Sequence, residues 1–191
     1  MSLRQRQRAE TKQRIQRQAI RLFAEQGYDA TTVNEVAAAA GVAAMTVYRN
    51  FPTKEDLVLY DDFDQVAAAT ITALPAKGSL ADRIARTMLA TFDLAIAHDR
   101  DFLLTRLRLM ISTPALQARH LDSQYRLQEA FVTAIRAGST DAALEFQARA
   151  AASACLGVAH IALLRWASED GETSLPDLFR DAFTATFGHA V

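Results

Sequence analysis

The chain has 191 residues, of which 50% are hydrophobic and 23% charged, with only 7 Gly and 4 Pro. This composition excludes a disordered chain and a large multidomain enzyme, and it predicts a folded helical protein. A single cysteine, Cys155, excludes an intramolecular disulfide and is typical of a reducing compartment. No segment approaches the roughly 18 apolar residues that cross a bilayer, and we expect no signal peptide. A cytoplasmic protein without a membrane partner is therefore expected.

The charges are unevenly distributed along the chain. Residues 1–54 hold nine basic and four acidic residues, whereas the remaining 137 hold 12 basic and 18 acidic ones. A cationic module that faces a polyanion and a solvated basic helix without a partner both fit this distribution.

Apolar spacing and turn residues predict a series of helices. Ile15, Ala19 and Leu22 form one apolar stripe of a helix over 8–26, which Gly27 ends. Thr32 and Glu35 have the spacing of a capping box that starts a helix over 33–40.

Gly41 interrupts the pattern before a short helix over 44–51, which Pro52 closes. Helix, glycine-containing turn and helix form the helix-turn-helix arrangement, and it lies in the basic part of the chain.

Six further helices are predicted beyond this motif, at 54–74, 79–98, 101–111, 114–137, 141–166 and 174–187. No segment shows the alternation of a strand, so the predicted fold class is all-α with about nine helices.

The first 58 residues resemble the tetracycline-repressor (TetR) family of one-component bacterial transcription regulators. The resemblance rests on Ile15, Ala19, Leu22, Phe23, Gly27, Tyr28, Thr31-Thr32-Val33, Val36-Ala37, Ala40-Gly41-Val42, residues 46–52, Lys54-Glu55 and Leu57. It implies a three-helix DNA-binding domain at 1–54 and a larger helical ligand-binding and dimerisation domain at 55–191. A ligand-responsive regulator follows, acting as a repressor that a small molecule releases from a palindromic operator. The stretch 51–64 together with 106–114 also resembles a subgroup that senses acyl-CoA-like molecules.

The recognition helix of such a motif lies in the major groove, where its first residues meet base edges. Arg49 is the residue here that can bind guanine in a bidentate manner. The predicted DNA-binding residues, taken from the motif and the resemblance, are Thr32, Asn34, Ala44, Met45, Thr46, Tyr48, Arg49 and Lys54. Ala43 replaces the capping serine that most family members have. The arginines 4, 6 and 8 form an arm that either enters the minor groove or is solvated and disordered.

Two further sets of residues are predicted in the larger domain. Candidates for the ligand pocket, which the resemblance places among the middle helices, are Phe92, Phe102, Arg106, Met110, Tyr125, His160 and Trp166. Arg106 and Arg108 lie in an apolar run, and an arginine there that points inward needs an anion. Candidates for the dimer interface are Gly157, Leu175, Phe179 and Phe183. The same apolar residues would instead complete the core of one chain if no dimer formed.

Residues 59–191 contain no catalytic motif, no metal-ligand spacing and no phosphate-binding glycine loop, so we expect no enzyme, cofactor or metal. The alternatives that stay open are a helical-bundle enzyme or small-molecule carrier, and a DNA-binding protein that responds to no ligand.

Overall fold

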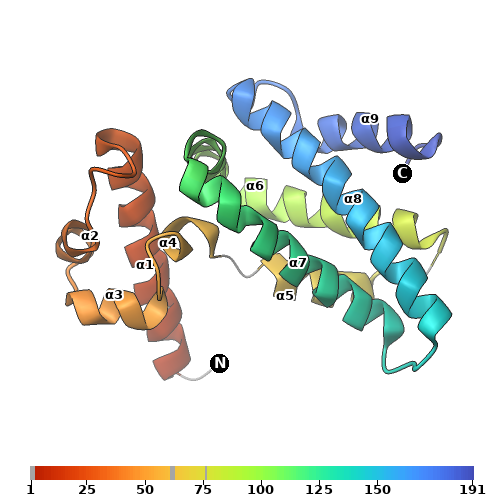
Figure 1. Cartoon of the computed structure of the whole chain (residues 1–191), viewed down its shortest axis with the longest axis horizontal. Helices are drawn as coiled ribbons and strands as arrows, with labels where there is room; N and C mark the ends of the chain where they lie inside the picture. Colours follow the sequence, from red (N-terminus) through yellow and green to blue (C-terminus); the bar gives the residue numbers. More distant parts are fainter. Residues whose placement is uncertain (1–2, 61–62, 76) are drawn as a thin grey trace. The chain divides into compact units, whose positions relative to one another are not determined.

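The computed structural model describes residues 3–60, 63–75 and 77–191. Over these ranges the chain forms nine helices and no strand, which confirms the all-α fold class (Figure 1). They are α1 (Leu3–Gln26), α2 (Val33–Ala39), α3 (Ala44–Asn50), α4 (Asp56–Leu59), α5 (Phe63–Ala73), α6 (Leu80–Ser112), α7 (Pro114–Arg136), α8 (Ala142–Ser168) and α9 (Leu175–Phe187).

The helix expected over 54–74 is not continuous, and that prediction was wrong. Tyr60 ends α4 with extended backbone, at φ −68° and ψ 128°. Its carbonyl oxygen accepts a hydrogen bond from Gln16 Nε2 of α1 at 2.6 Å. In a continuous helix, this carbonyl would instead accept from a backbone amide of the same helix. Residues 61 and 62, which the expected helix also covers, lie outside the described residues.

Conversely, α6 joins the two helices expected at 79–98 and 101–111. Asp99 lies within it in extended backbone, at φ −165° and ψ 86°. Its Oδ1 accepts a hydrogen bond from the Phe102 amide at 3.1 Å, as the cap of a new helix does. The expected break is therefore present as a kink at Asp99.

The chain divides into two units. One comprises residues 1–60 and 105–120, and the other comprises 61–104 and 121–191. Both α6 and α7 contribute residues to each unit, since the divisions fall inside these helices. The expected domain boundary after residue 54 stays a prediction.

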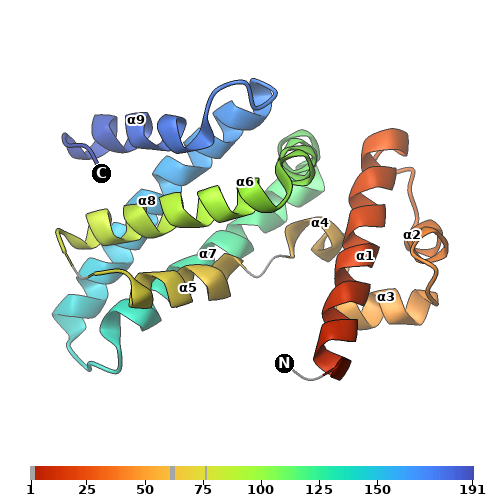
Figure 2. The same ribbon diagram turned by 180° about the vertical axis from the view of Figure 1, so that it is seen from behind.

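The first unit is built around α1. Ile15 and Phe23 on α1 are buried, as are Val36 on α2, Val47 on α3 and Leu57 on α4. Figure 2 shows α4 and α2 beside α1, which agrees with the packing of these helices. The predicted apolar stripe of α1 is thus the centre of this core.

The second unit has an aromatic core in which α9 packs on α8. The rings of Phe92 and Phe179 meet edge to face with centroids 5.6 Å apart, and Phe179 also lies 6.2 Å from Phe183. Leu175, Phe179 and Phe183 are each at most 1% exposed in the single chain. Their side chains are thus buried in the core of one chain, and their assignment to a dimer interface stays a prediction.

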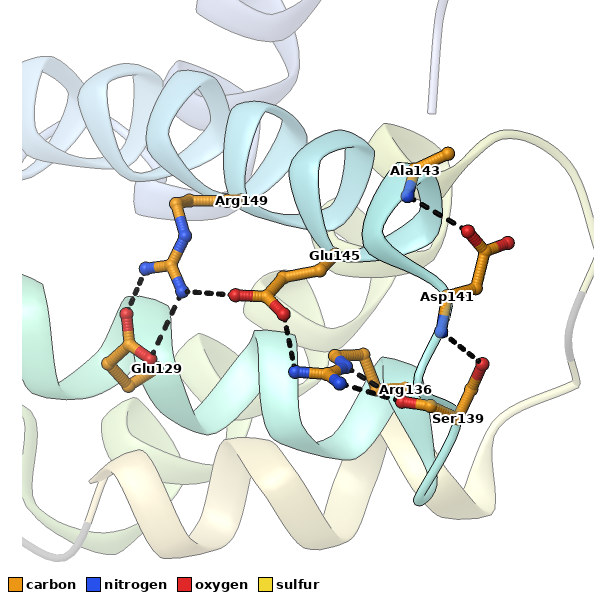
Figure 3. Close-up of polar contacts among 7 residues, drawn as sticks. All are labelled: Glu129, Arg136, Ser139, Asp141, Ala143, Glu145 and Arg149. Atoms are coloured by element: carbon orange, nitrogen blue, oxygen red, sulfur yellow. Dashed lines mark hydrogen bonds and ion pairs between the residues drawn. The ribbon is translucent and has the colours of Figure 1, made fainter.

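The turn between α7 and α8 is closed by polar contacts (Figure 3). Arg136 donates from Nε and Nη2 to the carbonyl of Ser139, and from Nη1 to Glu145 at 2.6 Å. Glu145 also accepts from Arg149, which pairs with Glu129 on α7. Asp141 caps α8 by accepting from the Ala143 amide. This network ties the end of α7 to the first turns of α8.

By length and composition alone, α8 could span a membrane, with a mean hydropathy of 1.4 over 18 residues. The expectation that no segment approaches this length was therefore wrong by that criterion. A core helix passes the same test, and α8 buries Ala148, Cys155 and Trp166 inside the second unit.

Burial raises the pKa of the Cys155 thiol to about 12, so the thiol stays protonated at neutral pH.

The end of the chain is tied to α6 by an ion pair. His189 Nε2 lies 2.8 Å from Asp82 Oδ1, and this contact raises the pKa of His189 and lowers that of Asp82. A raised pKa means that the contribution of His189 to stability is complete below its unfolded pKa of about 6.5 and is lost as the pH rises through the folded value. A lowered pKa means that the contribution of Asp82 is lost only as the pH falls through its folded value.

We therefore expect His189→Ala to lower the free energy of unfolding at about pH 5.5, where the histidine of the wild type is charged, and to have little effect at about pH 9. Urea unfolding of both proteins at the two pH values measures this difference. An equal loss of stability at both values would contradict the assigned ion pair.

Candidate nucleic-acid interface

The start of α2 is fixed by the predicted capping box. Thr32 Oγ1 accepts a hydrogen bond from the Glu35 amide at 3.2 Å, and Glu35 Oε2 accepts from the Thr32 amide at 2.7 Å. The backbone hydrogen bond from Thr32 favours the ionised carboxylate and so lowers the pKa of Glu35. The capping box thus satisfies the amides of Thr32 and Glu35 at this end of the helix, as the sequence pattern indicated.

The turn into α3 depends on Gly41, whose backbone has φ +63°. This left-handed conformation costs glycine little and disfavours residues that carry a Cβ. Ala43 then takes the N-cap position of α3 with extended backbone and makes no side-chain cap. The amide at this end of the recognition helix thus lacks the hydroxyl partner that a serine would supply.

Helix α3 presents one face to the core and another to solvent. Val47 is 0% exposed, whereas Met45 is 63% and Tyr48 47% exposed, and Arg49 is exposed as well. Since residues three and four apart share a helix face, Met45, Tyr48 and Arg49 lie together. This face therefore combines three kinds of group that contact DNA. The methionine can contact a thymine methyl, the tyrosine hydroxyl a phosphate, and the arginine a guanine.

The other predicted DNA-binding residues flank this face with one exception. Thr32 and Asn34 are exposed at the start of α2, and Ala44 and Thr46 are half-buried on α3. Lys54 instead donates from its ammonium to the Tyr28 carbonyl at 2.5 Å and lies 4.4 Å from the centre of the Tyr28 ring. A phosphate contact by Lys54 stays a prediction, and it would use the remaining N–H groups of the ammonium.

The basic N-terminal segment is helical from Leu3 onward. The arginines 4, 6 and 8 are exposed on the first turns of α1, so this segment is helical rather than disordered, and its contact with the minor groove stays a prediction. Arginine, glutamine, alanine and glutamate dominate this segment, and all four are strong helix formers.

The predicted ligand-binding residues are divided between the two units. Phe92 and Trp166 are buried in the core of the second unit, Phe102 and His160 are half-buried there, and Tyr125 is 66% exposed.

Arg106 and Met110 belong to the first unit. Arg106 Nε donates to the Val58 carbonyl at 2.6 Å, so its partner is backbone at the end of α4. Arg108 lines a hollow of about 770 Å³ in the first unit, between the end of α1 and the junction of α6 and α7. Binding of a ligand by any of these residues stays a prediction.

Sequence reasoning missed Arg119 of α7. Its Nη1 donates to Thr53 Oγ1 at 2.9 Å and lies 3.6 Å from Glu55. The Thr53–Asp56 spacing of a capping box was a visible feature, but nothing in the sequence connects it to a residue 66 positions later. Within the described ranges, no three His, Cys, Asp or Glu side chains are grouped in a way that could hold a metal ion.

Comparison with known proteins adds two family models that match adjacent parts of the chain. Residues 15–60 match the model of bacterial regulatory proteins of the tetR family, and residues 79–187 match the model of the MftR C-terminal domain. The first match contains the whole helix-turn-helix, and the second covers more than half of the chain.

A Mycobacterium tuberculosis protein proposed to be the mycofactocin biosynthesis transcriptional regulator MftR is 29% identical over 185 residues, which cover 93% of this chain and 90% of that protein. The crystal structure of Thermus thermophilus FadR with lauroyl-CoA shares the fold, with a TM-score of 0.56, 21% identity, and coverage of 94% and 95% of the two chains. Bacillus subtilis FadR with stearoyl-CoA is similar, with a TM-score of 0.57, 18% identity, and coverage of 93% and 98%.

Proposed function

Because the chain belongs to the TetR family of bacterial regulatory proteins, with a C-terminal domain of the MftR type, we propose that it is a repressor that binds a palindromic operator as a homodimer and leaves it when a small molecule binds. Such a regulator acts on the chromosome and works in the cytoplasm.

The exposed face of α3 carries this proposal. Met45, Tyr48 and Arg49 project from a helix whose opposite face is anchored by Val47, and the capping box fixes the helix before it. Side chains on rigid helices recognise a groove precisely enough for specificity, because little conformational entropy is lost on binding. A dimer places two such helices about 34–36 Å apart, in successive major grooves.

For the dimer, the exposed stripe of α8 is the surface that we propose. It consists of Phe146, Ala150, Ala154, Gly157 and Ile161, at spacings of three and four residues. Phe146 is 74% and Ile161 58% exposed in the single chain, and the small residues between them let a second helix approach closely. We propose this stripe in place of the side chains predicted on α9, which are buried in the single chain. Of the predicted interface residues, Gly157 lies in the stripe.

We expect Gly157→Arg to produce monomers. A Cβ added at Gly157 meets no atom within 4 Å in the single chain, so the new side chain is tolerated in the monomer and obstructs only a partner. Light scattering gives the mass of the variant, and Leu94→Arg, which adds the same charge at a 60% exposed site on α6, should stay dimeric. A dimeric Gly157→Arg protein would place the interface elsewhere.

A coenzyme A thioester is the effector class that we propose. The solved structures with lauroyl-CoA and stearoyl-CoA support it through their shared fold, and the acyl-CoA subgroup resemblance of the sequence agrees with them. Thermal unfolding with lauroyl-CoA, and with free coenzyme A as the control, tests the proposal. A bound thioester raises the unfolding temperature, because it binds the folded chain only. The same rise with both compounds, or no rise with either, would contradict an acyl-specific site.

A further inference from the structure

Helix α4 depends on other helices for its ends. It spans four residues, Asp56–Leu59, and so short a helix is not stable by itself. At its C-terminal end, Arg106 of α6 donates from Nε to the Val58 carbonyl at 2.6 Å and from Nη2 to the Leu59 carbonyl at 3.5 Å. A guanidinium at this end also complements the negative pole of the helix.

The N-terminal end of α4 is held from α7. Thr53 and Asp56 are bonded to each other across the turn that leads into α4. Asp56 Oδ2 accepts from the Thr53 amide at 2.9 Å and from its hydroxyl at 2.8 Å, and the Asp56 amide donates to Thr53 Oγ1 at 3.3 Å. Arg119 Nη1 donates to Thr53 Oγ1 at 2.9 Å, and Nη2 lies 4.0 Å from Asp56. One arginine from α6 and one from α7 therefore hold the two ends of the same helix.

The position of α4 matters for α3, because residues 51–55 alone connect them. Phe51 and Leu57, on either side of this connection, are buried in the first unit. Both α6 and α7 continue from the first unit into the second. A displacement of α6 or α7 along its axis would thus act on α4 through the two guanidinium groups.

We propose that Arg106 and Arg119 form a clamp that couples α6 and α7 to the DNA-reading helices through α4. They are positioning residues that contact no DNA. The inference rests on the proposed function and names how that function is regulated. It assigns Arg106 a role in transmission in place of the ligand contact predicted for it. The rigid forked geometry of arginine suits this role, since one side chain binds two acceptors in a fixed arrangement.

Amide hydrogen exchange of the purified protein tests the clamp without any effector. The probe is a duplex that the wild-type protein selects from a randomised pool. In the wild type, this duplex should slow exchange in α2 and α3, and also in α4 and residues 105–120. If the coupling has the usual strength, the duplex should slow exchange in α4 and residues 105–120 by about 5- to 150-fold.

In Arg106→Gln and Arg119→Gln, the duplex should still slow exchange in α2 and α3, while its effect on residues 105–120 disappears. Arg119→Lys keeps a donor for Thr53 and should restore part of the effect. Arg126→Gln is the matched control on α7, because Arg126 is exposed and bonds Ser123 within its own helix. If the two arginines had a purely structural role, the glutamine variants would exchange faster in residues 105–120 by the same factor with and without the duplex.

The clamp would be overturned if the duplex still slowed exchange in residues 105–120 of both glutamine variants, or if it did not slow exchange there in the wild type. It would also be overturned if Arg126→Gln lost this slowing as fully as the glutamine variants of Arg106 and Arg119 do. A wild-type protein that selects no duplex would instead overturn the proposed function. Should a glutamine variant unfold, Arg106→Lys and Arg119→Lys provide the same comparison in a milder form.

Discussion

Replacing Arg49 with alanine should remove sequence-specific DNA binding. A bidentate arginine–guanine contact discriminates against a wrong base by about 1–3 kcal/mol, and a dimer makes it twice, so the expected loss is about 2–6 kcal/mol. Stability should be unaffected, because Arg49 is exposed and the buried anchor of α3 is Val47. Fluorescence anisotropy with the selected duplex and a scrambled one measures both affinity and specificity.

Arg21→Ala is the matched control for this experiment. Arg21 is exposed on α1 and pairs with Glu25 one turn later, so its loss removes the same charge without touching α3. We expect the control to bind the selected duplex almost as tightly as the wild type. If Arg49→Ala kept the affinity and the specificity of the wild type, α3 would not dock in the major groove through its exposed face.

The second large effect is expected at Phe183. Its side chain is 0% exposed and contacts Phe179 and Phe187, whose ring centroids lie 6.2 and 4.4 Å away. Truncation of a buried phenylalanine to alanine costs about 3–5 kcal/mol, because apolar burial is lost and a cavity remains. Phe183→Ala should therefore lower the free energy of unfolding by this amount, as measured by urea denaturation.

Tyr125→Ala provides the comparison in the same unit. Tyr125 is 66% exposed, and substitutions at such positions usually change stability by less than about 0.5 kcal/mol. The dimer interface proposed on α8 does not include Phe183, so its loss should act on folding before it acts on assembly. If Phe183→Ala gave a well-folded monomer, this would instead support the dimer interface that the sequence predicts on α9.

The helix-turn-helix was predictable because its determinants are local. The capping box of Thr32 and Glu35, and the glycines at 27 and 41, act over a few residues and are visible in the sequence. The exposed face of α3 follows from helical spacing once Val47 is placed inside.

The break at Tyr60 was not predictable, because no glycine or proline marks it. The carbonyl groups at the end of α4 receive hydrogen bonds from Gln16 and Arg106, which lie on two other helices. Apolar spacing on α9 predicted a buried face correctly, but spacing cannot distinguish burial within one chain from burial between two. In the single chain, Phe179 and Phe183 are each 0% exposed.

Selection of duplexes from a fully randomised DNA pool by the purified protein, followed by sequencing, tests the central claim most directly. We predict that the pool converges on one palindromic sequence, whose two half-sites have centres about one DNA turn or a small multiple of it apart, since a two-fold dimer presents two copies of α3. The selected duplex should also bind more tightly than the starting pool by about 10³-fold or more at physiological salt. A pool that stays random, or retention that depends on salt alone and not on sequence, would contradict the assignment of this chain as a sequence-specific regulator.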